Sequence, residues 1–580
     1  MPRLTQLIER ISRALSRRGR VGLPARAGVL ALSISVLCPG PLALGAPVDL
    51  GELTPFYRGT QLQGHIFGQG LIDIPAYLTA GDIDILYRKN PALRKEIPFV
   101  DTFSINRFLG GYKPQWIKQY GNWDPSLGNA SLDYVVRGSD GQLKNRPDIL
   151  RRHLQPYIDA GYKLDAITIN LENVPWAIAR SEGTEGPFGQ RNPPKNIDDW
   201  RWTVHHLAED IKSTYGASGT PHFKIGNEFN TKKSFNGTTQ DYVDLYTTSY
   251  QALRQVFPHA SVVPGEFTGT GACHNFDVCV YDVKDFLSRA NALDAAPNYL
   301  PRSLHAFQNI PRQVMPSQTV QRAVNSYRGL ERGRPEIHQF GLLGQPFGAF
   351  AQFGSDASVR QAAWQFQVLV GLWGTLRPAR VFHWGGVSVY QNGKTPLLNG
   401  TGFLRLFLDR YLGRRMYRLA VTPERGVNAE VAAVTFTRNG AQAIMVSSFS
   451  LSPGEGRTKV TVEMPEPANL NGWKYTVLDS ATDVFMTIRR DLAAAGNLKP
   501  QFAQCATCTA EPRSMAVDAA AAQQMIATRE EQYEQAIQNT LRWKPIDQLA
   551  SLERDTRSGK LRLELSENEL LILESPQAAP

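Results

Sequence analysis

The stretch Asn145–Leu171, NRPDILRRHLQPYIDAGYKLDAITINL, predicts a helix that leads into a strand. Asn145 can cap the helix, and Pro147 suits its first turn. Apolar residues recur on one helical face at Leu150, Leu154, Tyr157 and Ile158. Gly161 is typical of a helix end, and the apolar run Ala166–Leu171 that follows predicts a buried strand.

The same alternation of amphipathic helix and short apolar run extends from about residue 60 to about residue 415. It favours a parallel sheet with helical crossovers. Eight candidate strands lie at His65–Phe67, Phe103–Leu109, Ala166–Leu171, Phe223–Asn227, Ser261–Pro264, Ser303–Phe307, Glu336–Phe340 and Val381–Trp384. Eight such units predict an α/β chain with a (β/α)8 TIM barrel over residues 47–418.

The pattern changes after residue 419. Four strand-like runs with hairpin-like links lie at Glu430–Thr437, Gln442–Phe449, Thr458–Met464 and Trp473–Asp479. Residues 561–574 add two more strands. These runs predict a C-terminal β-sandwich over residues 419–580, with a partly helical insertion at about 485–555.

Residues 1–46 have the composition of an export signal. They hold seven Arg against one Glu, and an apolar run, Ala27–Leu37, follows the basic start. We expect this signal peptide to direct the chain to the periplasm or out of the cell, and an uncut membrane anchor is the alternative. The segment supplies more than half of the net charge of +10, so the rest of the chain does not have the basic surface expected of a nucleic-acid-binding protein.

Four cysteines beyond the signal form two close pairs, Cys273 with Cys279 and Cys505 with Cys508. In an exported chain such pairs predict two local disulfides. The C-x-x-C pair could also be a redox motif or half of a zinc site. No spacing typical of a metal site or a nucleotide fingerprint supports a cofactor.

The run Lys224–Asn230, KIGNEFN, places an Asn-Glu pair where an apolar strand ends. A carboxyl at the C-terminal mouth of a barrel strand, here Glu228, can protonate a glycosidic oxygen. The preceding Asn227 can hydrogen-bond a sugar hydroxyl. Alternatively, Glu228 is a solvated acid in an ordinary turn.

Five motifs in barrel order give the chain a family resemblance. They are Ile105–Phe108 at the second strand, Asn173–Ala179 at the third, Gly226–Asn230 at the fourth, Ser303–Phe307 at the sixth and Phe382–Trp384 at the eighth. Together they resemble clan A glycoside hydrolases, most closely family 39, which contains β-xylosidases and α-L-iduronidases. The resemblance implies a glycoside hydrolase of poly- or oligosaccharides with Glu228 as general acid/base. It also implies a nucleophile on the seventh strand, and there the matching position in Arg334–Gly341 is Gln339.

An amide cannot carry the glycosyl group as a carboxylate does, so three hypotheses remain open. Glu336 could be the nucleophile of a retaining enzyme, the outcome that we expect first. Alternatively, Glu266 or Glu172, which follow other strands, could be the second carboxylate of an inverting enzyme. The third possibility is a pseudoenzyme that binds glycans without hydrolysis.

The resemblance also implies substrate contacts around these acids. Arg107 would hold the seventh-strand acid ionised, His305 would contact substrate, and Trp384 would stack on a sugar face. His65 is a weaker candidate of the same type. Each of these residues could equally have a structural role in an ion pair or in the core.

Overall fold

The structure is a computed structural model. It describes residues 47–62, 101–119, 121–159, 161–180, 186, 189–268, 282–307, 315–330, 333–343, 358–384, 388–391, 395–423, 429–450, 458–463, 469–496, 498–501, 514–517, 519–555 and 560–578. The predicted export signal, His65 and all four paired cysteines therefore lie outside the described residues.

Eight parallel strands form the predicted barrel. Around the barrel they are β8 (Val262–Pro264), β7 (His222–Ile225), β6 (Ile167–Leu171), β3 (Thr102–Ile105), β2 (Gly59–Leu62), β11 (Arg380–Trp384), β10 (Arg334–Leu343) and β9 (Tyr299–Phe307). The ring closes where Phe267 pairs with Arg302 beyond the end of β8. The (β/α)8 prediction is confirmed, with β2 taking the first position, ahead of the expected His65–Phe67.

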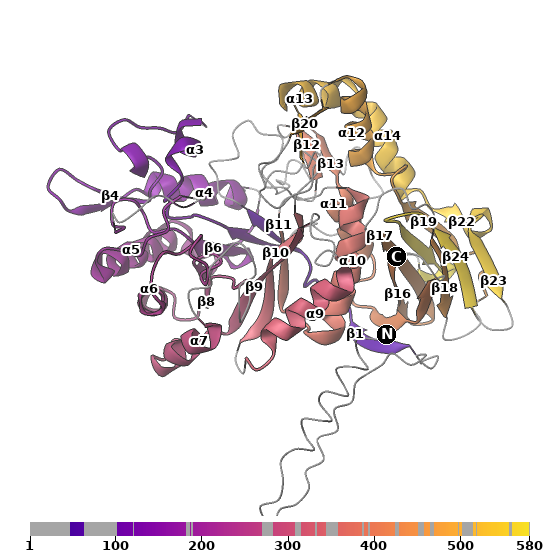
Figure 1. Cartoon of the computed structure of the whole chain (residues 1–580), viewed down its shortest axis with the longest axis horizontal. Helices are drawn as coiled ribbons and strands as arrows, with labels where there is room; N and C mark the ends of the chain where they lie inside the picture. Colours follow the sequence, from indigo (N-terminus) through magenta and orange to yellow (C-terminus); the bar gives the residue numbers. More distant parts are fainter. Residues whose placement is uncertain are drawn as a thin grey trace, which may run out of the picture. The chain divides into compact units, whose positions relative to one another are not determined.

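Helices pack outside these strands, as Figure 1 shows. They are α3 (Pro114–Gln119), α4 (Pro147–Asp159), α5 (Ile197–Tyr215), α6 (Thr239–Val256), α7 (Val283–Ala292), α9 (Pro316–Tyr327), α10 (Val359–Thr375) and α11 (Gly400–Asp409). Local chemistry fixes their starts: Asn196 caps α5, and Thr238 with Asp241 forms a capping box at α6.

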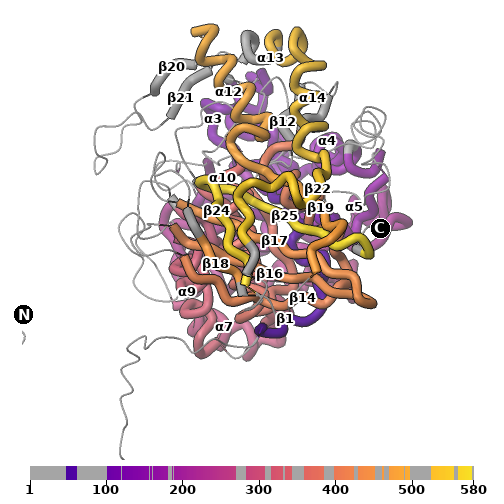
Figure 2. The backbone as a smooth tube through the Cα atoms, turned by 90° about the vertical axis from the view of Figure 1, so that its right-hand side faces the viewer, coloured from indigo at the N-terminus to yellow at the C-terminus, as the bar shows by residue number. Residues whose placement is uncertain are grey.

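The sandwich has a seven-stranded sheet and a four-stranded sheet (Figure 2). The first is β1 (Val48–Glu52), β14 (Arg415–Leu419), β16 (Ala429–Arg438), β17 (Ala441–Ser450), β25 (Leu570–Glu574), β19 (Lys474–Leu478) and β22 (Lys544–Pro545). The second is β15 (Val421–Pro423), β18 (Thr458–Glu463), β24 (Lys560–Leu565) and β23 (Leu552–Asp555). Because β1 pairs with β14, the sandwich includes a strand from the range predicted for the barrel.

The predicted insertion is partly helical. It holds α12 (Val484–Ala494), α13 (Ala519–Thr528) and α14 (Glu530–Leu541), with the small hairpin β20 (Leu498–Gln501) and β21 (Ser514–Val517). Two further hairpins are β4 (Val135–Arg137) with β5 (Leu143–Asn145), and β12 (Ser388–Gln391) with β13 (Thr395–Leu398). Among all the residues that the structure describes, no helix is long and apolar enough to cross a membrane.

Helix α10 is buried along most of its length, because it packs between the barrel and the sandwich. Gln367 on α10 donates hydrogen bonds to the Ser447 carbonyl on β17 (3.1 Å) and to the Glu430 carbonyl on β16 (3.1 Å). Asp483, just before α12, accepts a hydrogen bond from the backbone N–H of Val359 at 2.7 Å. The helix thus supports β10 and β11 on one side and the sandwich on the other.

Candidate active site

Three residues other than glycine adopt the left-handed backbone conformation at or near the C-terminal mouth of the barrel. Their φ values are 51° for Arg107 after β3, 41° for Glu228 after β7 and 48° for Gln339 within β10. Such a conformation costs on the order of 1–3 kcal/mol per residue and is concentrated at functional sites. The strain therefore identifies this mouth as the candidate site, in agreement with the sequence motifs.

The Asn227–Glu228 pair is held just past the end of β7. Both residues are buried, with 6% and 7% of their surface exposed. The Tyr242 hydroxyl donates to the carbonyl of Ile225 at 2.7 Å and accepts from the N–H of Gly265 at 3.0 Å. Gly265 must be glycine, because a Cβ there would lie 2.6 Å from the backbone of the β7 loop. These contacts fix the position of the predicted proton donor.

A β-bulge turns Gln339 toward the mouth. The pairing of β10 with β9 shifts register between His338 and Gly341. Side chains replace the missing ladder bonds: Gln61 accepts from the N–H of Gln339 at 2.8 Å, and His383 lies 2.9 Å from the Phe340 carbonyl. The bulge is thus supported by β2 and β11.

The Gln339 amide links three other predicted site residues, one directly and two through Ser303. Its Nε2 donates to Asn227 Oδ1 at 3.1 Å, across the mouth, and its Oε1 accepts from Ser303 Oγ at 2.6 Å. Ser303 Oγ also lies 2.9 Å from His305 Nδ1. The His305 ring meets the partly exposed Trp384 edge to face, with centroids 6.2 Å apart. The predicted grouping of Asn227, His305, Gln339 and Trp384 is therefore present in the structure.

His305 lies in an electropositive environment. Burial, together with the charges of Lys233, Arg322 and Arg302, lowers the pKa of His305 to about 3, although the carboxylate of Glu266 raises it. The imidazole is therefore neutral over the ordinary pH range. It can exchange hydrogen bonds with Ser303 or substrate without carrying charge.

Arg107 pairs with Glu172 rather than with an acid on the seventh strand. Its Nη2 lies 3.0 Å from Glu172 Oε1, and both side chains are nearly fully buried. The expected contact with Glu336 is therefore corrected: Arg107 instead supports the carboxyl that follows β6. Burial raises the pKa of Glu172, while Arg107 opposes that rise.

Glu172 is one of the residues that line a small cavity. Oε2 is buried and receives no hydrogen bond within the described part of the chain. The cavity lies between the loops after β6 and β7 and helix α6. Its polar lining residues include Glu172, Gln190, Asn192, Asn227 and Ser234, and its apolar ones include Val174, Phe229 and Leu245. Glu172 follows Leu171, which pairs with Ile225 of β7, so Glu172 and Glu228 follow neighbouring strands. A water molecule in this cavity would have polar partners.

Glu266 points into the barrel and not toward substrate. Its Oε2 lies 2.6 Å from Lys224 Nζ, and neither side chain is exposed. Its Oε1 accepts from Gln61 Nε2 at 3.2 Å. Although burial raises the pKa of Glu266, Lys224 and His338 lower it, with a net decrease. The carboxylate is a structural ion in the barrel interior, which argues against its predicted catalytic role.

Glu336 lies at the opposite end of the barrel from Glu228. It is the third residue of β10, it pairs in register with Arg380 at the start of β11, and its Oε1 lies 2.7 Å from an Arg380 nitrogen. Its negative charge acts to raise the pKa of His222, the first residue of β7. The hypothesis that Glu336 is the nucleophile is therefore corrected, because a residue near the strand start cannot reach substrate at the mouth.

Sequence reasoning missed Gln61 and the role of Lys224. Gln61 lies in β2, a strand whose short sequence GTQL has no clear apolar run. Lys224 lies within β7, and no role was predicted for its side chain. The described residues contain no group of three or more His, Cys, Asp or Glu side chains that could hold a metal ion.

No protein-family model matches the chain. It is 23% identical over 319 residues to an α-1,4-L-rhamnosidase from Formosa agariphila, covering 51% of this chain and 60% of that protein. It is 29% identical over 127 residues to a β-xylosidase from Caldicellulosiruptor saccharolyticus, covering 21% of this chain and 24% of that protein. The chain therefore matches less than two thirds of the length of either relative.

Solved structures share the whole fold. A monomeric β-xylosidase from Caulobacter crescentus CB15 is 12% identical with a TM-score of 0.53, over 91% of this chain and 97% of that one. A family 39 enzyme from Xanthomonas axonopodis pv. citri is 13% identical with a TM-score of 0.54, over 93% and 99%. The resemblance to family 39 is confirmed at the level of the fold, and these relatives and neighbours are glycoside hydrolases.

The Lys224–Glu266 pair can be tested by a double-mutant cycle. Lys224→Met and Glu266→Gln should each lower the free energy of unfolding, by about 3–5 kcal/mol for Lys224→Met, because it leaves a buried charge unpaired. The double variant should lose less than the sum of the two. Urea denaturation measures all four proteins. A Glu266→Gln variant with unchanged stability but no turnover would instead make Glu266 catalytic.

Glu336 should contribute stability that is lost in acid. Burial raises its pKa, but Arg380 and the hydrogen bond with His338 outweigh this and lower it to about 2, from 4.5. Since the folded pKa is the lower one, the contribution is present above pH 4.5 and is lost as pH falls toward 2. Glu336→Gln should therefore be less stable than wild type at pH 7, and the gap should narrow between pH 4.5 and 2.

Urea denaturation over this pH range measures the gap, with the exposed Glu531→Gln on α14 as matched control. A gap that does not change with pH would contradict the assignment. The folded fraction of Glu336→Gln should keep its turnover, because the residue lies far from the mouth.

Proposed function

We propose that the chain is a glycoside hydrolase of a poly- or oligosaccharide, with Glu228 as the proton donor. The observation that carries this proposal is the buried Asn227–Glu228 pair, held in a strained conformation at the mouth of a closed eight-stranded barrel. His305 and Trp384 beside it supply a polar contact and a ring for one sugar. The glycosidases that the chain resembles support the same reaction class.

The names of the two sequence relatives suggest the first substrates to test. They are an α-1,4-L-rhamnosidase and a β-xylosidase. Rhamnose carries a methyl group at C5, and xylose in its pyranose form has no exocyclic carbon there. Both present an apolar ring face that can stack on an indole such as that of Trp384. We propose aryl α-L-rhamnosides and aryl β-D-xylosides as probes. We also propose that residues 1–46 act as the signal that directs the chain to the periplasm or out of the cell.

In the proposed mechanism, Glu228 gives its proton to the leaving oxygen through an oxocarbenium-like transition state. Asn227, whose Oδ1 is fixed by Gln339, can donate its Nδ2–H to a hydroxyl of the sugar. Retention would require a carboxylate about 5–5.5 Å from the proton donor. Gln339 occupies the facing side of the mouth, so we propose that water attacks directly and that configuration inverts.

We assign the role of general base to Glu172. Glu172 and Asn227 line the same cavity, and Glu172 Oε2 accepts no hydrogen bond within the described residues. Burial raises its pKa, which makes it a better proton acceptor than an ordinary carboxylate, and Arg107 orients it. Of the acids considered from the sequence, Glu266 and Glu336 point elsewhere.

Glycan binding without turnover is the second candidate function. The observation that favours it is the amide of Gln339, whose N–H bond to Asn227 Oδ1 a carboxylate could not make. On this alternative, the mouth retains its sugar contacts, but no group assists the entering nucleophile. Wild-type turnover on any glycoside decides between the two functions.

Glu228→Gln should lose activity in a way that depends on the leaving group. General acid catalysis is worth about 10²–10⁴-fold, and a nitrophenolate that leaves without protonation needs little of it. We therefore expect a large fall in kcat/KM for methyl or disaccharide substrates and a small fall for dinitrophenyl glycosides. Steady-state kinetics on both series measures this. Equal losses on both series would indicate a structural role for Glu228.

Glu172→Gln should lose activity whatever the leaving group, by about 10²–10⁴-fold, because water activation is needed in every case. Thermal denaturation must accompany the kinetics, since the variant removes the charge that pairs with Arg107. NMR of the first-formed sugar anomer in wild type should show inversion. First-formed product of retained configuration, or full activity in a folded Glu172→Gln variant, would rule out this base.

A further inference from the structure

We propose that the C-terminal sandwich carries a second carbohydrate site, separate from the barrel mouth, which binds a neutral sugar chain rich in hydroxyls. The site is a cavity between β19, the end of α14 with β22, and the segment where β24 turns into β25. Figure 2 shows α14, β22 and β19 side by side on the sandwich, and β22 pairs with β19. The inference goes beyond the proposed function and rests on it for the class of ligand.

The cavity is large enough for a sugar unit. It offers about 280 Å³, close to the lower end of the range of about 300–1,000 Å³ for small-ligand sites. The cavity beside Glu172 offers about 10 Å³, room for about one water molecule. Exposed residues, among them Arg542 and Ala550, line the larger cavity, so it opens to solvent. Of these two cavities, the one in the sandwich can therefore admit a sugar from solution.

Hydrogen bonds fix the walls of the sandwich cavity. Thr476 Oγ1 on β19 donates to the Thr540 carbonyl on α14 at 2.6 Å, and Thr540 Oγ1 donates to the Thr482 carbonyl at 2.6 Å. The Tyr475 hydroxyl donates to the Gln548 carbonyl at 3.3 Å. These bonds join β19 to α14 and to the segment after β22. The walls are thus formed without a ligand, which lowers the entropy cost of binding one.

The lining also presents apolar surface. Val477 and Leu549 are half-buried, and both pack against the hydrophobic core between the two sheets of the sandwich. Their remaining surface can contact the C–H groups of a pyranose ring. A sugar needs such contacts together with polar groups that fix its orientation.

Charged side chains of both signs line the cavity. They are Asp479, Glu564 and Glu569 with Arg542 and Lys544. Carboxylates accept hydrogen bonds from hydroxyl groups, and guanidinium and ammonium groups donate to the hydroxyl oxygens. Three carboxylates against two cations leave the lining slightly negative. The balance therefore disfavours an acidic sugar such as a uronate and favours a neutral one.

Two of these charges are not used by the fold. Neither Arg542 nor Glu564 forms an ion pair within the part of the chain that the structure describes. Glu569, in contrast, is only 5% exposed, and its Oε2 accepts a hydrogen bond from the N–H of Ser566 at 2.6 Å. We therefore assign Arg542 and Glu564 as contacts to the sugar hydroxyls and Glu569 as a fixed part of the wall.

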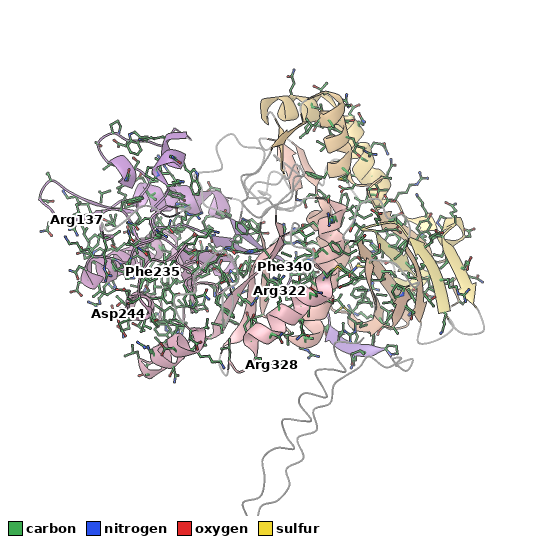
Figure 3. All side chains as sticks on the ribbon, in the orientation of Figure 1. Arg137, Phe235, Asp244, Arg322, Arg328 and Phe340 are labelled. Atoms are coloured by element: carbon green, nitrogen blue, oxygen red, sulfur yellow. The ribbon has the colours of Figure 1, made fainter. Side chains whose placement is uncertain are left out.

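The site is distinct from the barrel mouth. Its strands belong to the sandwich, and α10 packs between the sandwich and the barrel. Figure 3 labels Phe340 on β10, which lies on the barrel side. A long glycan held at the sandwich stays attached to the molecule that hydrolyses it, which raises its effective concentration at the mouth.

Hydrogen–deuterium exchange of the full Glu228→Gln chain tests the site, with xylotetraose or methyl α-L-rhamnoside as probe. Peptides over residues 539–551 and 564–569 report the cavity, and those over 226–230 report the mouth. We expect at least one probe to slow exchange at the cavity. Adding Arg542→Ala with Glu564→Ala should abolish protection there and leave the mouth unchanged. Tetragalacturonate, an acidic sugar chain, should protect the cavity less than the neutral probes.

The matched control is Arg562→Ala with Glu553→Ala. These residues are exposed and pair in register on β24 and β23, outside the cavity lining, so their removal should leave protection unchanged. Thermal denaturation shows whether each variant is folded. If the cavity variant is unfolded, Ala550→Met replaces it, because a larger side chain takes up part of the cavity without removing a charge.

The outcomes separate the two proposals. Protection at the cavity that the cavity variant abolishes supports the inference, whether or not the mouth is protected. Protection at the mouth alone overturns the inference and leaves the hydrolase proposal standing. Cavity protection that survives in the folded cavity variant, or no protection at the cavity with either neutral probe, also overturns the inference. Equal protection by tetragalacturonate would contradict the neutral class of ligand.

Discussion

The buried ion pair between Lys224 and Glu266 is the constraint on which the rest of the site depends. Two charges with no exposed surface are tolerated only when their remaining hydrogen-bonding groups are satisfied. Gln61 Nε2 donates a hydrogen bond to Glu266, and it also donates to Asn106 Oδ1 at 3.3 Å. Through its own oxygen, Gln61 holds the backbone of Gln339. The height of β10 relative to β2, β7 and β8 is thus set by a polar layer inside the barrel.

That layer explains how the mouth keeps three strained residues. Arg107, Glu228 and Gln339 each sit in a conformation that side chains normally avoid. Two of them are held by buried neighbours: Arg107 by Glu172, and Gln339 by Gln61 and Ser303. Strain of this kind persists only where surrounding structure fixes it. The alternative of an ordinary turn with a solvated acid is inconsistent with the burial of Glu228.

Local periodicity was enough to predict most of the fold. The helix that begins after Asn145 and the strand that ends at Leu171 follow from capping and apolar spacing, signals that need no tertiary contact. The first barrel strand did not follow, because Gln61 is polar yet points into the barrel interior, where it contacts Asn106 and Glu266. An apolar run is a poor guide where the core contains a hydrogen-bonded layer. β1 was missed for another reason: its pairing with β14 spans more than 360 residues.

From the sequence, the site could be predicted only to the extent that the order of the strands determines which residues meet. The strand ends at Asn227, His305 and Trp384 converge because parallel strands share one mouth. The choice between Glu336 and Gln339 depended on a bulge, and a bulge has no signature in composition. The partner of Arg107 likewise depends on which neighbouring strand offers a carboxylate at the same height. Register and height are tertiary quantities, so the sequence left these alternatives open.

Charge balance links the fold to the chemistry. An oxocarbenium-like transition state carries positive charge on the sugar ring, and a facing carboxylate would stabilise it. Here the facing group is the neutral amide of Gln339. In the proposed mechanism, direct attack by water relies on Glu172 to accept the proton and to supply negative charge. The polar layer that fixes Gln339 therefore also determines which kind of nucleophile the barrel can use.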